Sequence, residues 1–244
     1  MSDDFAVSPL SNREIREYAF NTKRTYGAER RWPVNIVKCL QSGFIPTRFG
    51  KKILIYKVVD DKELGTKDAR TDFEDGKVVI TVKRSVHDKA NWGDGRSRMT
   101  LAHELAHGVL HYGVTMYRSA GASGTTALSQ INAARSAEHQ AKVFASAFLI
   151  DDEVAATFDS AQEVSTEFLV SLEAAEICWS RVMEKKSSKE YIRELNESFQ
   201  ADTQPVRHQF SYSEKACPEC QNPTLIPIGV GLLCHTCGYH ETAE

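Results

Sequence analysis

The chain has 244 residues, of which 41% are hydrophobic, and its formal net charge at pH 7 is −3. This length and apolar content predict a globular protein with one large domain, or with a medium domain and a small appendage. The near-neutral charge excludes a general attraction to nucleic acid, although local basic segments remain possible. Residues 1–20 lack the basic start and apolar run of a secretion signal, and no stretch is long and apolar enough to cross a membrane, so a cytoplasmic location is expected.

Two helices are expected between residues 11 and 42. Ile15, Tyr18 and Ala19 follow helical spacing, and Pro33 suits the first turn of a second helix. Residues 13–38 carry seven Lys or Arg and three Glu, a net charge of +4. Such a stretch can meet nucleic acid or an acidic partner, although it is more often a solvated face. We assign residues 1–50 to an N-terminal helical segment and leave its role open.

A small antiparallel sheet is expected next. Residues 53–59 (ILIYKVV) and 77–83 (KVVITVK) are β-branched and aromatic runs of strand length, and Asp75-Gly76 lies where a tight hairpin turn is needed. An edge strand can hold an extended peptide as an added strand, through main-chain hydrogen bonds. The hairpin strand is therefore a candidate substrate edge, and an ordinary edge strand without a ligand fits the sequence equally well.

Residues 101–111 (LAHELAHGVLH) contain the sequence His-Glu-x-x-His at His103, Glu104 and His107. On an α-helix the two histidines lie about 40° apart and one turn from each other, so both imidazoles reach the same ion. Glu104 lies about 100° from His103, near enough to a water on the metal to act as a general base without becoming a ligand. The pattern predicts a catalytic zinc site, and a surface helix with two histidines is the plainer alternative.

A catalytic zinc ion needs a third protein ligand and one open position. Residues 137–150 (AEHQAKVFASAFLI) are expected to form a helix in which small and apolar residues surround Glu138, so Glu138 is the best candidate. His111 is a weaker candidate, because eight residues of unbroken helix carry it about 12 Å beyond His103. His139 ranks third, because it points about 100° away from Glu138.

Residues 114–132 are rich in Gly, Ala, Ser and Thr and show little periodicity. They are expected to form a lid over the metal, with plain disorder as the alternative. Residues 160–186 and 188–199 have apolar residues at helical spacing, with a possible helix start at Ser171. We interpret these helices as packing elements.

The carboxyl-terminal part is expected to be a separate zinc module. Residues 201–215 are polar and mark a linker between a domain of residues 51–200 and residues 216–244. Two C-x-x-C pairs lie 13 residues apart, and about 28 residues cannot bury enough core to fold without a metal. The pattern predicts a closed structural site of the zinc-ribbon type, with a redox dithiol as the alternative. The expected ligands are Cys217, Cys220, Cys234 and Cys237, whereas Cys39 and Cys178 stand alone among apolar neighbours and are interpreted as inert buried thiols.

Three segments in order, SRMTLAHELAHGVLH, EHQAKVFASAFLI and VSLEAAEICWSRV, resemble the ImmA/IrrE family of zinc metallopeptidases over residues 50–185. The resemblance implies an α+β fold of the minimal zincin type. It implies that Glu104 is the general base and that His103, His107 and Glu138 bind zinc. It also implies a substrate class, since several members of the family cleave a helix-turn-helix repressor and thereby switch on stress or transfer genes.

The chain departs from the family at Ala106, where Gly is usual, and at Asp151, where Pro is common. The zinc ribbon lies outside the resemblance. We therefore expect an endopeptidase with one catalytic and one structural zinc ion and a protein substrate such as a helix-turn-helix repressor. Nucleic-acid contact through the ribbon or the basic residues 13–38 has no further support, and no membrane contact is expected. The alternative is a non-catalytic regulatory protein that uses the zincin fold and the ribbon to dock a protein or nucleic acid.

Overall fold

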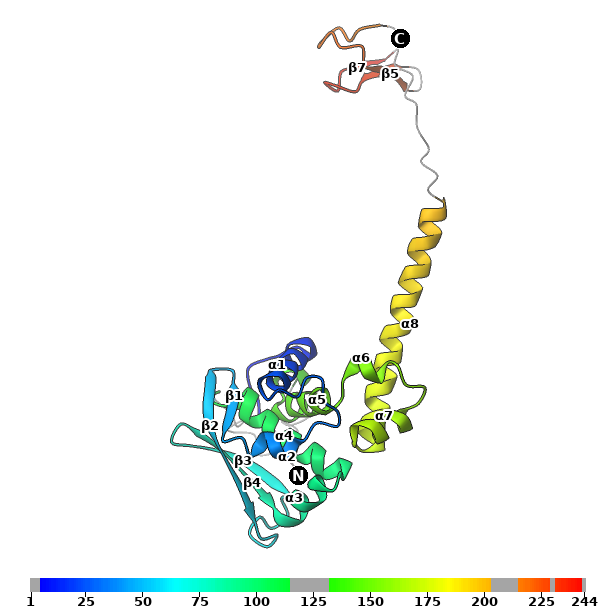
Figure 1. The fold of residues 1–244 in the computed structure, drawn as a ribbon. Helices are drawn as coiled ribbons and strands as arrows, with labels where there is room; N and C mark the ends of the chain where they lie inside the picture. The colour runs from blue at the N-terminus through cyan, green and yellow to red at the C-terminus, as the bar shows by residue number, and fades with distance from the viewer. Residues whose placement is uncertain (1–4, 115–131, 203–214, 229–230, 243–244) are drawn as a thin grey trace, which may run out of the picture. The chain divides into compact units, whose positions relative to one another are not determined.

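The computed structural model describes residues 5–114, 132–202, 215–228 and 231–242 (Figure 1). The chain divides into two compact units, residues 1–189 and residues 190–244. All but the ends of the loop expected at 114–132 lies outside the described residues, as does most of the linker expected at 201–215. In chain order the elements are α1 (Asn12–Thr25), α2 (Ile36–Leu40), β1 (Phe44–Thr47), β2 (Gly50–Val59), β3 (Ala69–Glu74), β4 (Lys77–Lys83), α3 (Arg84–Asn91), α4 (Gly95–His111), the short 3-10 helix η2 (Ala133–Arg135), α5 (Ala137–Leu149), α6 (Asp152–Ala155), α7 (Ala161–Phe168), α8 (Leu172–Asp202), β5 (Leu225–Ile228), β6 (Gly231–Cys234) and β7 (His240–Thr242).

The first unit contains a four-stranded sheet in the order β1-β2-β4-β3. β3 and β4 form a hairpin, and its turn lies at Asp75 and Gly76 as expected, with φ angles of 47° and 75° that suit a tight turn. β1 pairs antiparallel with β2, but β2 and β4 run parallel. The sheet is therefore mixed, and the expectation of a wholly antiparallel sheet is wrong. The reason is that β4 forms its hairpin with β3 and not with β2. β4 therefore lies between β2 and β3 in the sheet.

The helix with the His-Glu-x-x-His sequence, α4, packs on the sheet. Asp94 caps it, because the Asp94 carboxylate accepts a hydrogen bond from the backbone N–H of Ser97 at 2.8 Å. Gly108 permits the close approach of helix and sheet, since a Cβ atom there would lie 2.6 Å from Cδ1 of Ile45. Fully buried side chains of β4 and α4 join the same core, among them Val78, Ile80, Val82, Leu101 and Leu105.

Further helices cover α4. α5 packs on α4 and α1 packs on α5, so the sheet, α4, α5 and α1 follow one another in layers (Figure 1). Phe144 and Phe148 of α5 are fully buried and stacked, with ring centroids 5.9 Å apart. Ile15 of α1 and Ile36 of α2 are fully buried in the same core cluster. The N-terminal helices therefore share the core of the domain that carries the sheet.

The chain turns sharply between α7 and α8. Leu169 ends α7 with a φ angle of 51°, and the hydroxyl of Ser171 accepts a hydrogen bond from the backbone N–H of Ala174 at 3.3 Å, as a helix cap does. The expected helix start at Ser171 is thus confirmed. The separate helix expected at 188–199 is wrong, because α8 continues through these residues without a break.

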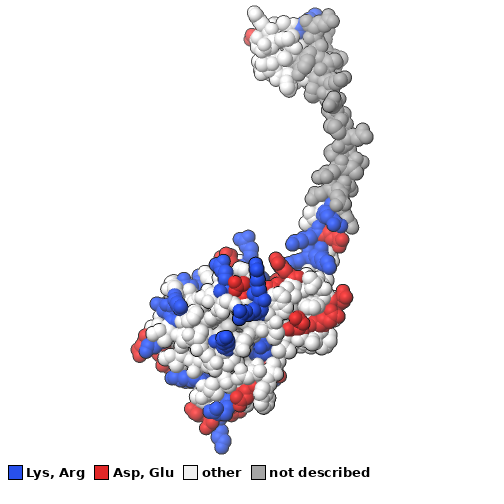
Figure 2. Space-filling view, viewed as in Figure 1, with Lys and Arg blue, Asp and Glu red and all other residues white. Residues whose placement is uncertain are grey.

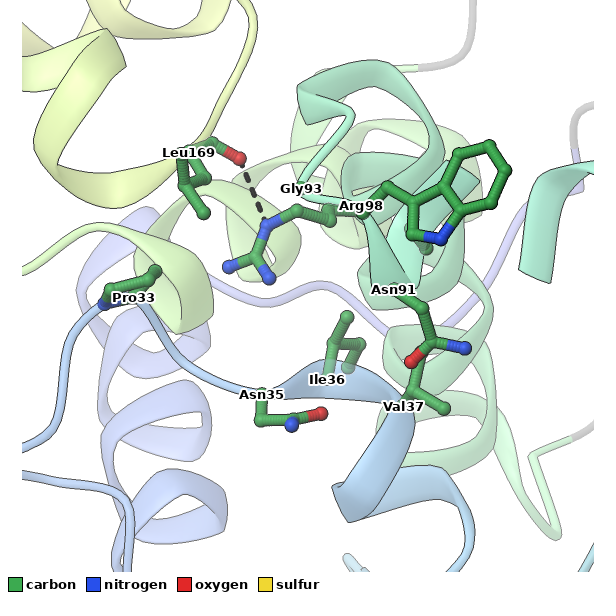
Figure 3. A pocket seen from close by; sticks show the side chains of 10 residues that line it. Pro33, Asn35, Ile36, Val37, Asn91, Gly93, Arg98 and Leu169 are labelled. Carbon is green, nitrogen blue, oxygen red and sulfur yellow. Dashed lines mark hydrogen bonds between the residues drawn. The ribbon is translucent and has the colours of Figure 1, made fainter. Parts of the chain in front are cut away.

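Arg98 of α4 joins two other segments to the core (Figure 3). Its side chain is buried and donates hydrogen bonds from Nε to the carbonyl of Leu169 at 2.9 Å and from Nη2 to the carbonyl of Val34 at 2.8 Å. Pro33 and Asn35 line a small cavity of about 220 Å³ beside it. Because one carbonyl precedes α2 and the other lies between α7 and α8, Arg98 holds both segments against α4.

In the second unit, β5, β6 and β7 form an antiparallel sheet in that order. The β5–β6 hairpin fills the segment between the two C-x-x-C pairs, where the sequence has room for one. The α+β class with a small cysteine module at the carboxyl end is therefore confirmed. Among the described helices, none combines the length and the apolar character needed to span a bilayer.

Candidate metal centres

The packing of α5 on α4 brings Glu138 to the two histidines of the His-Glu-x-x-His sequence. The Nε2 atoms of His103 and His107 lie 3.0 Å apart. The Glu138 carboxylate lies 3.3 Å from Nε2 of His103 and 3.5 Å from Nε2 of His107. The neighbouring His103 and His107 outweigh partial burial and lower the pKa of Glu138. The three side chains form a candidate ligand set with an anionic member.

The spacing of these three side chains fits a zinc ion. Tetrahedral zinc with bonds of about 2.0–2.1 Å to nitrogen and oxygen separates neighbouring ligand atoms by about 3.3 Å. The separations of 3.0, 3.3 and 3.5 Å bracket that value. Two imidazoles and one carboxylate are also a ligand set of catalytic zinc, which keeps its fourth position open. The residues present therefore fit the expected catalytic metal.

A buried glutamine sets the hydrogen-bonding pattern behind His107. Gln140 is fully buried, and its Nε2 donates to the carbonyls of Ser8 at 3.0 Å and Ala134 at 2.7 Å. Since both partners only accept, the Gln140 amide has one orientation, and its Oε1 faces Nε2 of His111 at 3.1 Å. His111 therefore donates from Nε2.

The proton on His111 in turn decides the tautomer of His107. Burial, followed by the neighbouring His107, lowers the pKa of His111 to about 4, so its ring is neutral and carries a single proton. With that proton on Nε2, Nδ1 of His111 accepts from Nδ1 of His107 at 3.0 Å. Nε2 of His107 is then unprotonated and faces Glu138. This is the tautomer that a metal ligand needs.

Glu104 is buried beside the ligand set and is held by a residue of the sheet. The Thr71 hydroxyl of β3 lies 2.7 Å from Oε2 of Glu104 and 2.9 Å from the Glu104 main-chain oxygen. Because these contacts occupy one carboxylate oxygen, the other remains to accept a proton. The arrangement suits a general base that is close to a metal but does not bind it.

The four cysteines of the second unit also converge. The Sγ atoms of Cys217 and Cys237 lie 3.7 Å apart, and those of Cys220 and Cys234 lie 3.5 Å apart. Zinc with four bonds of about 2.3 Å to sulfur places neighbouring sulfur atoms about 3.8 Å apart. The cluster therefore fits a closed four-thiolate zinc site. None of the four is in a disulfide.

The two C-x-x-C turns have the same backbone geometry. The residues that follow them, Gln221 and Gly238, have φ angles of 57° and 79°. Each donates its backbone N–H to the carbonyl of the first cysteine of its pair, at 2.8 Å to Cys217 and 2.9 Å to Cys234. A hydrogen bond from the Thr224 hydroxyl lowers the pKa of the Cys234 thiol to about 5, which favours the thiolate that zinc binds.

The other sequence candidates do not join either ligand set. Nε2 of His139 lies 3.2 Å from the side-chain oxygen of Asn12, so His139 belongs to the contact between α5 and α1. His111 is no ligand either, because its two ring nitrogens contact His107 and Gln140. Cys39 and Cys178 are buried, and burial raises the pKa of each thiol to about 11, in agreement with inert thiols.

Sequence reasoning missed three residues that support the site. Thr71 and Gln140 carry no pattern that points to it, because their partners lie 33 and 29 residues away. His111 had a usable signal, its spacing of four residues from His107, which places the two rings on one helix face. That signal indicates a hydrogen-bond partner of a ligand as readily as a ligand.

Residues 61–180 match the family model described as the IrrE N-terminal-like domain, a peptidase family. The match includes all four residues of the first centre and excludes the cysteine cluster. No curated protein matches the chain.

Proposed function

Because residues 61–180 belong to the IrrE N-terminal-like family of zinc metallopeptidases, we propose that this chain is a zinc-dependent endopeptidase that cleaves a specific regulatory protein, such as a helix-turn-helix repressor. The observation that carries the proposal is the convergence of His103, His107 and Glu138 at zinc-ligand spacing, with Glu104 held beside them. The four-thiolate cluster is proposed to hold a second, structural zinc ion.

Each residue of the first centre has a distinct role in hydrolysis. Zinc bound by His103, His107 and Glu138 would polarise the scissile carbonyl and lower the pKa of water toward about 7. Glu104 accepts a proton from the attacking water and returns it to the leaving amine. Thr71 holds one oxygen of Glu104, which directs the free oxygen and restricts the carboxylate during the reaction.

The edge strand β3 is the proposed binding site for an extended substrate segment. β3 pairs only with β4 among the described strands, and its Thr71 contacts Glu104. A substrate segment added along β3 would pass beside the general base, and main-chain hydrogen bonds would hold it. An added strand must be extended, so the proposed cleavage falls in a flexible or edge segment of the repressor.

The test mixes the purified, zinc-loaded chain with any helix-turn-helix repressor that a neighbouring gene encodes and searches for defined fragments by mass spectrometry. The matched control is Glu104→Gln, which keeps shape and ligands but removes the base. Loss of a general base costs about 10²- to 10⁴-fold in rate. We expect one defined pair of fragments from the wild type and none from the variant over the same time.

A different outcome would favour the docking alternative. If the wild type cleaves neither the repressor nor any cellular protein, and Glu104→Gln retains full biological activity, the peptidase proposal fails.

A further inference from the structure

A groove leads away from the first metal centre within residues 1–189. It has a volume of about 770 Å³ and is bounded by α1, α4, α5 and α8, and His103 forms part of its wall. That volume lies in the range of about 300–1,000 Å³ that is typical of ligand sites. It is large enough for several side chains of a bound peptide. Because a zinc ligand lines the groove, whatever occupies it lies next to the reacting bond.

The floor of the groove is apolar. Met99 of α4, Val143 of α5 and Ala174 and Ile177 of α8 contribute to its lining. Ile177 is 65% exposed, although the neighbouring Cys178 and Ala175, two residues before it, are buried. An exposed apolar floor gains free energy when an apolar side chain covers it.

The rim of the groove is basic. Arg16, Arg96, Lys142 and Arg181 line it, against one carboxylate, Glu173. Figure 2 shows Lys and Arg side chains gathered over α5, beside α1. The rim therefore favours an anionic occupant.

The four cations of the rim differ in how closely carboxylates pair with them. Arg181 and Arg16 share the carboxylate of Asp152, at 2.6 and 3.5 Å. In the described part of the chain, neither Arg96 nor Lys142 lies within 4.0 Å of a carboxylate. Arg96 belongs to α4 and Lys142 to α5, and both residues line the groove.

We propose that this groove binds the substrate residues next to the scissile bond and selects an apolar side chain with Asp or Glu as a close neighbour. The inference rests on the proposed peptidase function and adds a substrate preference to it. The apolar floor receives the side chain, and Arg96 and Lys142 pair with the carboxylates. A nucleic acid suits the groove less well, because its backbone has no apolar side chain for the floor.

The test measures peptide binding separately from cleavage. The zinc-loaded Glu104→Gln chain is incubated with a synthetic library of random peptides, and the retained peptides are sequenced by mass spectrometry. A second protein adds the changes Arg96→Glu and Lys142→Glu. The matched control adds Lys62→Glu and Lys67→Glu, which change the same charge at exposed positions outside the groove. Zinc content is measured for every variant.

We expect Glu104→Gln and the matched control to retain peptides in which Asp or Glu neighbours Leu, Ile, Met, Val or Phe. The enrichment should be about two- to thirty-fold, the range for two exposed ion pairs, and should fall as salt is added. The Arg96→Glu and Lys142→Glu protein should lose this preference and favour Lys or Arg. In a third variant, Ile177→Ser should weaken the apolar preference and leave the acidic one.

An acidic preference that persists in the charge-reversed protein, or its absence from the Glu104→Gln chain, overturns the groove assignment. So does binding of single-stranded oligothymidylate that depends on Arg96 and Lys142 without any peptide selection. The peptidase proposal is tested apart from this, by adding the retained peptides to the wild type. Peptides that bind with the expected preference but are not cut would defeat the peptidase proposal alone.

Discussion

Oε1 of Gln140 lies 3.1 Å from Nε2 of His111, and this contact determines which nitrogen of His107 is free to bind a metal. Two main-chain carbonyls orient the amide of Gln140. A continuous series of hydrogen bonds therefore runs from the backbone through Gln140 and His111 to His107. Each N–H group in this series has one acceptor. Reversing the hydrogen bond between His107 and His111 would put a proton on the His107 nitrogen that faces Glu138.

Gln140→Leu should weaken zinc binding at the first centre by about 10- to 100-fold, as loss of a partner behind a ligating histidine does. The change keeps the volume but removes the acceptor for His111, so the tautomer of His107 is no longer imposed. Chelator competition measures the affinity, and nitrogen chemical shifts of His107 in the zinc-free protein report the tautomer. His139→Ala, one residue away on α5, is the control. Unchanged affinity and unchanged shifts in a folded Gln140→Leu protein would contradict this role.

Thr71→Val should lower kcat/KM by about 10-fold or more and leave zinc content unchanged. The valine preserves shape but removes a hydrogen bond to a charged group, which contributes about 1.5–3 kcal/mol. Steady-state hydrolysis of the cleaved substrate, with metal analysis of the same sample, measures both effects. Thr166→Val removes a hydroxyl that donates to the carbonyl of Gln162 within α7, and this variant should behave as wild type. Equal rates for the two variants would show that Glu104 needs no support from β3.

Glu138→Ala should empty the first centre, whereas His139→Ala should leave it occupied. Glu138 lies within 3.5 Å of both histidine Nε2 atoms, and His139 contacts Asn12 instead. Zinc content per folded chain, measured after gel filtration, distinguishes the two. Loss of zinc from His139→Ala and retention by Glu138→Ala would reverse the ligand assignment.

The chain should bind two zinc ions that differ in lability. A chelator should remove the ion at the open His103, His107 and Glu138 centre first, and removal of the four-thiolate ion should unfold the second unit, which has little core of its own. Cys217→Ser should reduce the zinc content by one ion per chain without changing the first centre. One zinc per wild-type chain, unaffected by this change, would rule out the ribbon.

The ion pair of Asp152 with Arg181 should stabilise the fold in a pH-dependent way. Burial raises the pKa of Asp152, but the hydrogen bonds and charge of Arg181 outweigh it, so the pKa in the folded state lies below its usual value. A depressed pKa contributes stability above the unfolded-state value of about 3.9, and the contribution disappears as pH falls through the folded-state value.

Asp152→Asn should therefore lower the free energy of unfolding by about 1–2 kcal/mol at pH 6 and by much less near pH 3. Urea unfolding at both values measures the difference. Asp60→Asn, which removes an exposed pair with Arg84 at 3.8 Å, should have almost no effect at either pH. A deficit of Asp152→Asn that does not shrink at low pH would show that the ion pair is not its cause.

The sequence alone determined the features that depend on neighbouring residues. A helical period places His103 and His107 on one face with Glu104 beside them, and Asp75-Gly76 defines a hairpin turn without reference to the rest of the chain. The C-x-x-C pairs are equally local, since each turn closes through a hydrogen bond across four residues. Such features are readable because backbone geometry and residue type decide them within one or two turns of chain.

Tertiary structure decided everything that requires two distant segments to meet. From the sequence, Glu138 was the best of three candidates for the third ligand, and only the packing of α5 on α4 places it beside the two histidines. No sequence pattern predicts the contact of Thr71 with Glu104 or that of Gln140 with His111. The parallel pairing of β2 with β4 depended on a strand order that local propensity does not specify. The physical reason is that side-chain packing across the whole core selects these contacts, and many pairings of the same helices and strands are compatible with the same local sequence.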